Sequence, residues 1–187
     1  MSETTREKLL AEAEVLVRKR GWSGFSYADL AAAVGLRKAS IHHHFHVKED
    51  LGIALIEAYG LRYDQALAQI IASSADGLAR VEAYAKLYLH GLELEQGCLA
   101  AAMAAELGTL PPRIRDGVAA FFQRHIAWLH QILAEGQING TIGDDVDPDQ
   151  SARMVVATLE SALMIERWLG GAPGFEAALA ALRKSLK

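Results

Sequence analysis

Residues 25–51, FSYADLAAAVGLRKASIHHHFHVKEDL, decide the fold of this chain because they predict two short helices and the turn between them. Ser26 and Asp29 form an S-x-x-D capping box, which marks the start of the first helix. Gly35 interrupts the helical pattern where a tight turn needs a positive φ angle. A second helix follows from about residue 37 to 44. Two short helices joined by a glycine-containing turn indicate a helix-turn-helix, whose second helix lies in the DNA major groove.

The same stretch resembles the N-terminal signature of the TetR/AcrR family of bacterial transcriptional regulators. Residues 35–45, GLRKASIHHHF, are followed by KEDL at 48–51. They are similar to the family pattern G-hydrophobic-S-x-(G/A)-(S/T)-hydrophobic-Y-x-H-F, then K-x-x-L. The resemblance covers about residues 6–55, and the rest of the chain is similar only in helical pattern and length. Arg37 stands where serine is common, and histidines replace aromatic residues at 42 and 43, so no operator sequence is carried over.

The resemblance implies a set of DNA-binding residues on and around the second helix. Contacts to base edges specify sequence, whereas contacts to phosphate position the protein. Lys38, Ser40 and His43 are expected in the groove, Tyr27, His42, His44 and Lys48 at phosphates, and Ser26 and Arg37 complete the set. Lys48 opens a third helix, where a cation and free backbone amides can hold a phosphate. The alternative is a solvated helix face with no partner.

Composition favours an all-helical globular protein. The chain has 187 residues, of which 51% are apolar and 7% aromatic, with no alternating strand pattern. The net charge of −4 is unevenly distributed: residues 1–50 hold eight Lys/Arg against seven Asp/Glu, a balance of +1, and residues 51–187 hold eleven against sixteen, a balance of −5. This distribution suits a protein that touches phosphate with one face.

A single cysteine, Cys98, excludes an intramolecular disulfide framework and favours a reducing cytoplasm. No stretch approaches about 18 uninterrupted apolar residues, so no membrane span is expected. The N-terminal residues MSETTREKLL lack the apolar core of a signal peptide.

Helical periodicity and breakers predict further helices along the chain. The expected ranges are about 5–20, 48–73, 78–94, 98–107, 113–136, 148–169 and 173–186. We expect a DNA-binding domain at 1–47 and an effector-binding and dimerisation domain at 48–187. Trp22 and Phe25 are expected to close the small core of the first domain.

Several aromatic, sulfur-containing and histidine side chains of the second domain are candidates for an effector pocket, because such pockets are mostly apolar with a few directed polar groups. They are Tyr63, Tyr84, Tyr88, Cys98, Met103, Phe121, His125 and Trp128. Core packing is the alternative for each. Cys98 follows Gly97 at an expected helix start, where the helix dipole favours a reactive thiolate. A lone cysteine is otherwise a small buried hydrophobe.

The last two expected helices carry apolar residues on more than one face. Pairing with the same helices of a second chain would bury them in a two-fold interface. Dimerisation also suits DNA binding, because two half-sites multiply specificity. An intramolecular core is the alternative.

Other functions have weaker support. His42 and His46 share a helix face, but no Cys or acidic residue completes a metal site, so neither metal nor cofactor is expected. An enzyme would need a nucleophile–base pair, and the body offers only scattered His90, His125, His130 and Glu106. A helical adaptor would leave the donors of the second helix unexplained.

The sequence therefore predicts an all-α homodimeric repressor that a small molecule or an electrophile releases from its operator. The effector would move the two DNA-binding domains out of register with successive major grooves, which lie about 34–36 Å apart. The coupling free energy needed is about 1–3 kcal/mol.

Overall fold

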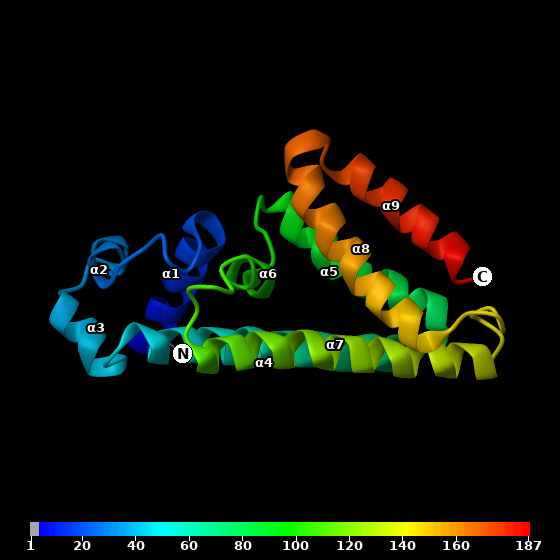
Figure 1. Cartoon of the computed structure of the whole chain (residues 1–187), viewed down its shortest axis with the longest axis horizontal. Coiled ribbons are helices and arrows are strands. Elements are labelled where there is room, and N and C mark those ends of the chain that lie inside the picture. Colours follow the sequence, from blue (N-terminus) through cyan, green and yellow to red (C-terminus); the bar gives the residue numbers. More distant parts are fainter. Residues whose placement is uncertain (1–3) are drawn as a thin grey trace. The chain divides into compact units, whose positions relative to one another are not determined.

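The structure, a computed structural model, describes residues 4–187, and these residues form helices joined by turns with no strand among them (Figure 1). The helices are α1 (Thr5–Arg20), α2 (Tyr27–Val34), α3 (Lys38–His44), α4 (Lys48–Ser73), α5 (Gly77–Glu93), α6 (Leu99–Ala104), α7 (Pro112–Ile138), α8 (Pro148–Leu169) and α9 (Ala172–Ser185). The all-α prediction is confirmed. No helix in the described part of the chain is long and apolar enough to cross a membrane.

Helix α1 begins and ends at local signals. The Thr4 hydroxyl accepts a hydrogen bond from the Glu7 backbone N–H, and the Glu7 carboxylate accepts one from the Thr4 backbone N–H, forming a capping box. Gly21 ends the helix with φ 79°. Leu9, Leu10, Ala13, Leu16 and Val17 are buried on one face. This stripe packs against the helix-turn-helix.

The helix-turn-helix forms as its sequence predicts. Ser26 caps α2, and Asp29 completes the capping box. Gly35 adopts the left-handed conformation (φ 72°), and its N–H donates to Ala31, which ends α2 and turns the chain into α3. Ile41 of α3 is fully buried, so the helix has one anchored side and one outward side.

The chain divides into two compact units. Unit 1 runs to Arg62 and also contains Leu99–Phe121; unit 2 contains Tyr63–Cys98 and Phe122–Lys187. Unit 1 therefore holds α1–α3, α6 and the first parts of α4 and α7. The predicted domain boundary between residues 47 and 48 stays a prediction.

In unit 1, Trp22 and Phe25 are 5% and 4% exposed, and their rings meet edge to face at 5.9 Å. Their predicted place in the small core is confirmed.

Helix α6 is shorter than the predicted 98–107. It ends at Ala104, and the following residues form turns in which the N–H of Glu106 bonds to Met103 and that of Thr109 bonds to Glu106. The Thr109 hydroxyl also donates to the Glu106 carbonyl. These short-range bonds replace the helical pattern after Ala104. The Glu106 side chain also accepts a hydrogen bond from the Ser23 N–H of a distant loop in unit 1.

In unit 2, α8 and α9 lie side by side and both pack on α5 (Figure 1). Asp147 caps α8, and Pro148 is the first residue of the helix, as the sequence predicts. The buried face of α8 includes Val155, Leu159 and Leu163, and that of α9 includes Phe175 and Leu179.

Candidate DNA-binding surface and effector site

The outward side of α3 carries most of the expected DNA-binding side chains. Arg37, Lys38, His42 and His43 are exposed, and Ser40 and His44 are half-buried. Arg37 is the N-cap of α3 but makes no side-chain capping bond, so its guanidinium is available to a partner. The His42 ring contacts Tyr27 edge to face at 5.0 Å, and its Nδ1 lies 3.2 Å from the His46 carbonyl oxygen.

Tyr27 packs within the helix-turn-helix, and its expected phosphate contact stays a prediction. It is 7% exposed, and its hydroxyl donates to the Phe45 carbonyl at 3.0 Å. Burial, followed by the charge of Asp50, raises the pKa of Tyr27 to about 12. The side chain therefore ties the start of α2 to the end of α3.

Lys48 is also occupied within the protein. Its ammonium donates to the carbonyls of Trp22 and Phe25, the latter at 2.6 Å, and lies 4.5 Å and 4.0 Å from the centres of their rings. Burial lowers the pKa of Lys48, although the charges of Glu106 and Asp29 act in the opposite direction. Lys48 therefore holds the loop between α1 and α2. Its contact with phosphate stays a prediction.

Ser26 acts through the capping box. Its hydroxyl lies 2.6 Å from Asp29 Oδ2 and also accepts from the Asp29 N–H. This role follows from the local S-x-x-D pattern, and a contact of Ser26 with DNA stays a prediction.

Six of the eight expected effector-site residues lie in unit 2, where several of them form one buried polar cluster. The Tyr84 hydroxyl lies 2.8 Å from both the Tyr88 hydroxyl and His125 Nδ1. Tyr63 contacts the His125 ring at 5.1 Å, and Trp128 contacts the Tyr84 ring at 5.5 Å. The sequence therefore predicted residues that do meet in space.

Burial sets the charge states in this cluster. It lowers the pKa of His125 to about 4, with help from the charge of Arg124, and it raises the pKa of Tyr84 and of Tyr88 well above the usual value. His125 and the two tyrosines are therefore neutral near pH 7, as hydrogen-bonding groups rather than ions.

Glu160 of α8 belongs to the same cluster, and the sequence analysis missed it. Its carboxyl interacts with Cys98 and Tyr88, and its Oε1 is inaccessible to solvent and has no hydrogen-bond partner within residues 4–187. Burial raises the pKa of Glu160 to about 7, against the effect of these hydrogen bonds. Its spacing from Val156 and Leu163 was the available signal, because positions four before and three after share one helix face.

Cys98 is 5% exposed and lies immediately before α6. The Glu160 carboxyl interacts with the Cys98 thiol. Like Glu160 Oε1, the indole Nε1 of Trp128 is buried without a hydrogen-bond partner among the described residues. Unsatisfied buried polar atoms are rare in folded proteins and cost about 1–3 kcal/mol each. Such atoms are the ones a polar ligand can satisfy.

Met103 and Phe121 belong to unit 1. Met103 is fully buried in α6, and the Phe121 ring packs on Tyr59 at 5.2 Å. These two residues have core partners in unit 1, which is the packing alternative considered for them.

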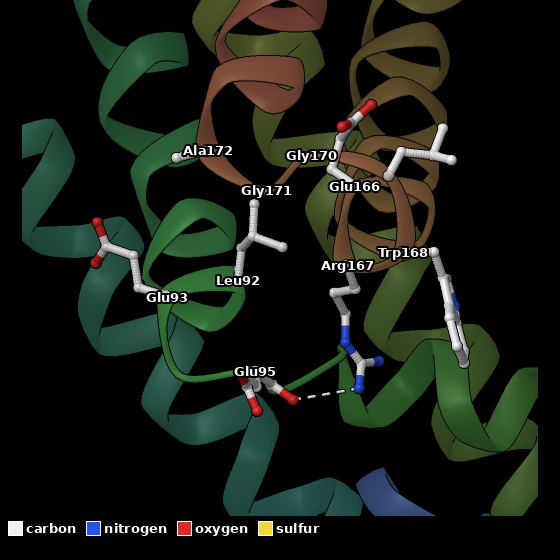
Figure 2. A pocket seen from close by; sticks show the side chains of 10 residues that line it. Leu92, Glu93, Glu95, Glu166, Arg167, Trp168, Gly170, Gly171 and Ala172 are labelled. Atoms are coloured by element: carbon white, nitrogen blue, oxygen red, sulfur yellow. Dashed lines mark hydrogen bonds between the residues drawn. The ribbon is translucent and has the colours of Figure 1, made fainter.

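An open hollow in unit 2 lies between the end of α5 and the turn from α8 to α9 (Figure 2). Its volume is about 610 Å³, and it is lined by Leu92, Glu93, Glu95, Glu166, Arg167, Trp168, Leu169, Gly170, Gly171 and Ala172. Arg167 reaches across to the Glu95 carbonyl at 3.2 Å, and Trp168 is 87% exposed. None of the expected effector residues lines this hollow.

A second, flatter hollow follows the outward face of α8 and reaches α9. It is lined by the small side chains of Ala157, Thr158, Ser161, Ala162 and Ala178, together with Ile165 and Glu166. Met164, Ile165 and Trp168 are exposed beside it. This face therefore exposes three large apolar side chains to solvent in a single chain.

Metal ligands do not gather in the described part of the chain, where no group of three or more His, Cys, Asp or Glu side chains could hold an ion.

Comparison with known proteins agrees with this geometry. The family profile of bacterial regulatory proteins of the tetR family matches residues 9–55, and that of the tetracyclin repressor-like C-terminal domain matches residues 77–182. The HTH-type transcriptional repressor NemR of Escherichia coli is 31% identical over 82% of this chain and 79% of its own length.

Two further similarities concern other bacteria. The transcriptional regulator AcuR of Cereibacter sphaeroides is 31% identical over 78% of this chain and 68% of its own length. The crystal structure of a TetR-family regulator from Agrobacterium tumefaciens superposes with a TM-score of 0.93 at 28% identity, covering 97% of both chains. The sequence similarity thus extends through both the helix-turn-helix and the C-terminal helices.

Proposed function

Since the chain belongs to the TetR family of bacterial transcriptional regulators, we propose that it is a repressor which binds its operator through α3 and leaves it when an effector binds. The observation that carries this proposal is the outward side of α3, where Arg37, Lys38, His42 and His43 are exposed beside the buried anchor Ile41. A short helix with this division matches the recognition helix of a helix-turn-helix.

The division of labour on this surface follows from exposure. Lys38 and His43, with Ser40 half-buried between them, are proposed to contact base edges. Arg37, His42 and His44 are proposed to contact phosphates. Tyr27, Lys48 and Ser26 support this surface from within through the bonds described above.

The effector is proposed to bind at the polar cluster of unit 2. Tyr84, Tyr88, His125 and Trp128 supply aromatic walls and neutral hydrogen-bonding groups, and Glu160 supplies an acceptor without a partner. A small molecule with a hydrogen-bond donor fits this set. An electrophile that modifies Cys98 is the second effector class, and it requires the cluster to open because the thiol is buried.

The active form is proposed to be a homodimer joined through α8 and α9. The apolar face of α8, with Ile165 and Trp168 exposed, supports this assignment. Two recognition helices related by a two-fold axis would read two half-sites. Operator DNA lies in the bacterial cytoplasm, so the proposed function places the protein there, and it includes no catalytic step.

The test is a duplex-binding assay with the DNA that flanks the protein's own coding region, with and without candidate effectors. Lys38→Ala and His43→Ala should each weaken specific binding by about 1–3 kcal/mol. Lys184→Ala, which removes an exposed charge in unit 2, is the matched control and should bind as the wild type does. Equal losses in all three variants, or binding without salt dependence, would contradict the proposal.

A further inference from the structure

The loop from Gly21 to Phe25 joins α1 to the helix-turn-helix and is held from two sides within unit 1. The ammonium of Lys48 in α4 donates hydrogen bonds to the carbonyls of Trp22 and Phe25. On another side of the loop, the turn that follows α6 contacts the backbone N–H and the hydroxyl of Ser23.

Glu106 makes the central contact of that turn. Its Oε2 accepts a hydrogen bond from the Ser23 backbone N–H at 2.9 Å, and the Ser23 hydroxyl lies 3.4 Å from that of Thr109. The two partners are separated by 83 residues in the chain. This contact is therefore tertiary, and no local pattern around Ser23 or Glu106 encodes it.

Gly21 shows how closely the turn approaches. Its φ of 79° disfavours any side chain, and a Cβ at this position would collide with Glu106 Oε1. The loop is thus shaped to let the carboxylate sit against its backbone.

The charge of Glu106 is maintained at this position. Burial favours the neutral acid, but hydrogen bonds from Ser23 and Trp22 and the charge of Lys48 outweigh it and lower the pKa of the carboxyl. An ionised acceptor makes a stronger bond to a backbone N–H than a neutral one. The loop is consequently held between an anion and a cation.

We propose that Glu106 is a positioning residue for operator binding, which fixes the Gly21–Phe25 loop and thereby the placement of α2 and α3. Glu106 does not touch DNA in this role. It acts through the Ser23 N–H and through its attraction to Lys48, so that the turn after α6 and the helix-turn-helix form one body.

The sign of the effect separates this role from simple electrostatics. Removal of a carboxylate from a DNA-binding unit reduces repulsion from phosphate and should tighten binding, most strongly at low salt. Loss of a positioning contact should instead weaken specific binding while leaving non-specific binding unchanged or tighter. An unfolding defect would weaken both kinds of binding.

The experiment compares specific and non-specific duplex binding of the full chain for Glu106→Ala, Glu106→Gln and the wild type. We expect Glu106→Ala to weaken specific binding by about five- to tenfold. Glu106→Gln keeps an amide oxygen for the Ser23 N–H and should recover part of the loss. Glu57→Gln, which removes an exposed carboxylate of α4, and Leu107→Ala, an exposed neighbour on the same turn, are the controls.

Hydrogen exchange supplies the second readout. In Glu106→Ala the amides of residues 21–25 should exchange faster, while those of α8 keep the wild-type rate. Specific binding equal to or tighter than the wild type in Glu106→Ala would overturn the proposal, as would unchanged exchange in the loop. Wild-type binding to the operator tests the proposed function separately, because it does not involve either substitution.

Discussion

Glu160 is a carboxyl group placed among Tyr88, Cys98 and the apolar residues of α8, and its burial sets its titration. Its pKa is about 7 in the folded protein against an ordinary value of 4.5. A group with a raised folded pKa stabilises the fold below its unfolded pKa and loses that contribution as pH rises through the folded value. The fold should therefore lose stability from Glu160 between about pH 4.5 and 7.

His125 titrates in the opposite sense. Its folded pKa of about 4 lies below the ordinary 6.5, so protonation opposes folding as pH falls from 6.5 toward 4. In the wild type the two effects partly cancel between pH 4.5 and 6.5.

The variant Glu160→Gln should separate these contributions, because the amide mimics the neutral acid. At pH 8 we expect the variant to be more stable than the wild type by roughly 1–3 kcal/mol, and below pH 4.5 the difference should shrink. Below pH 6.5 the stability of the variant should fall steadily, because of these two titrating groups only His125 is left. Denaturant unfolding at several pH values measures this difference.

Glu57→Gln, an exposed carboxyl, is the control and should show no such pH-dependent gain. A Glu160→Gln curve parallel to that of the wild type from pH 4.5 to 8 would show that the Glu160 carboxyl is not held in its neutral form.

Lys48, the first residue of α4, contacts other elements of unit 1. Its ammonium bonds to the loop between α1 and α2 and lies over the rings of Trp22 and Phe25. A phosphate-contacting lysine and a structural lysine both lower DNA affinity when removed. They differ in salt dependence.

We expect Lys48→Ala to destabilise unit 1 by about 1–3 kcal/mol, because two buried carbonyls lose a charged donor. Operator affinity should fall as well, but the slope of log affinity against log salt should stay at the wild-type value. Thermal unfolding and a salt titration of binding measure the two quantities.

Arg37→Ala gives the contrasting case, because Arg37 is exposed and proposed to contact phosphate. Removal of such a cation should reduce the magnitude of the salt slope by about one. A similar reduction of the salt slope in Lys48→Ala would show that Lys48 contacts phosphate.

At the scale of the whole molecule, the proposed dimer depends on the face of α8. Ile165 is 44% exposed and lines the hollow between α8 and α9. Replacement by Asp would bury a charge at the interface, which costs far more than a surface charge. We expect Ile165→Asp to sediment as a monomer where the wild type sediments as a dimer.

Loss of the dimer in Ile165→Asp should also lower operator affinity, because a single recognition helix offers few base contacts. Leu107→Asp places the same charge at an exposed apolar position of unit 1 and should leave the dimer intact. A dimeric Ile165→Asp would exclude this face as the interface.

The sequence predicted the parts of the fold that depend on neighbours in the chain. The capping box at Ser26, the left-handed Gly35 and the apolar periodicity of the helices all act within about four residues. The same local pattern identified α3 as the recognition helix and carried the family resemblance. The predicted range 98–107 is longer than α6, because turns with i→i+3 bonds follow Ala104.

The sequence alone thus determined an all-α chain with a helix-turn-helix and the residues on its outward side. Only the tertiary structure decided that Lys48 and Tyr27 turn inward, that Glu160 joins Cys98 and Tyr88, and that Glu106 holds Ser23. The physical reason is range: a helix is specified by contacts a few residues apart, whereas partners 83 residues apart meet only after the chain has packed. Burial, which sets the charges of Glu160 and His125, exists only in that packed state.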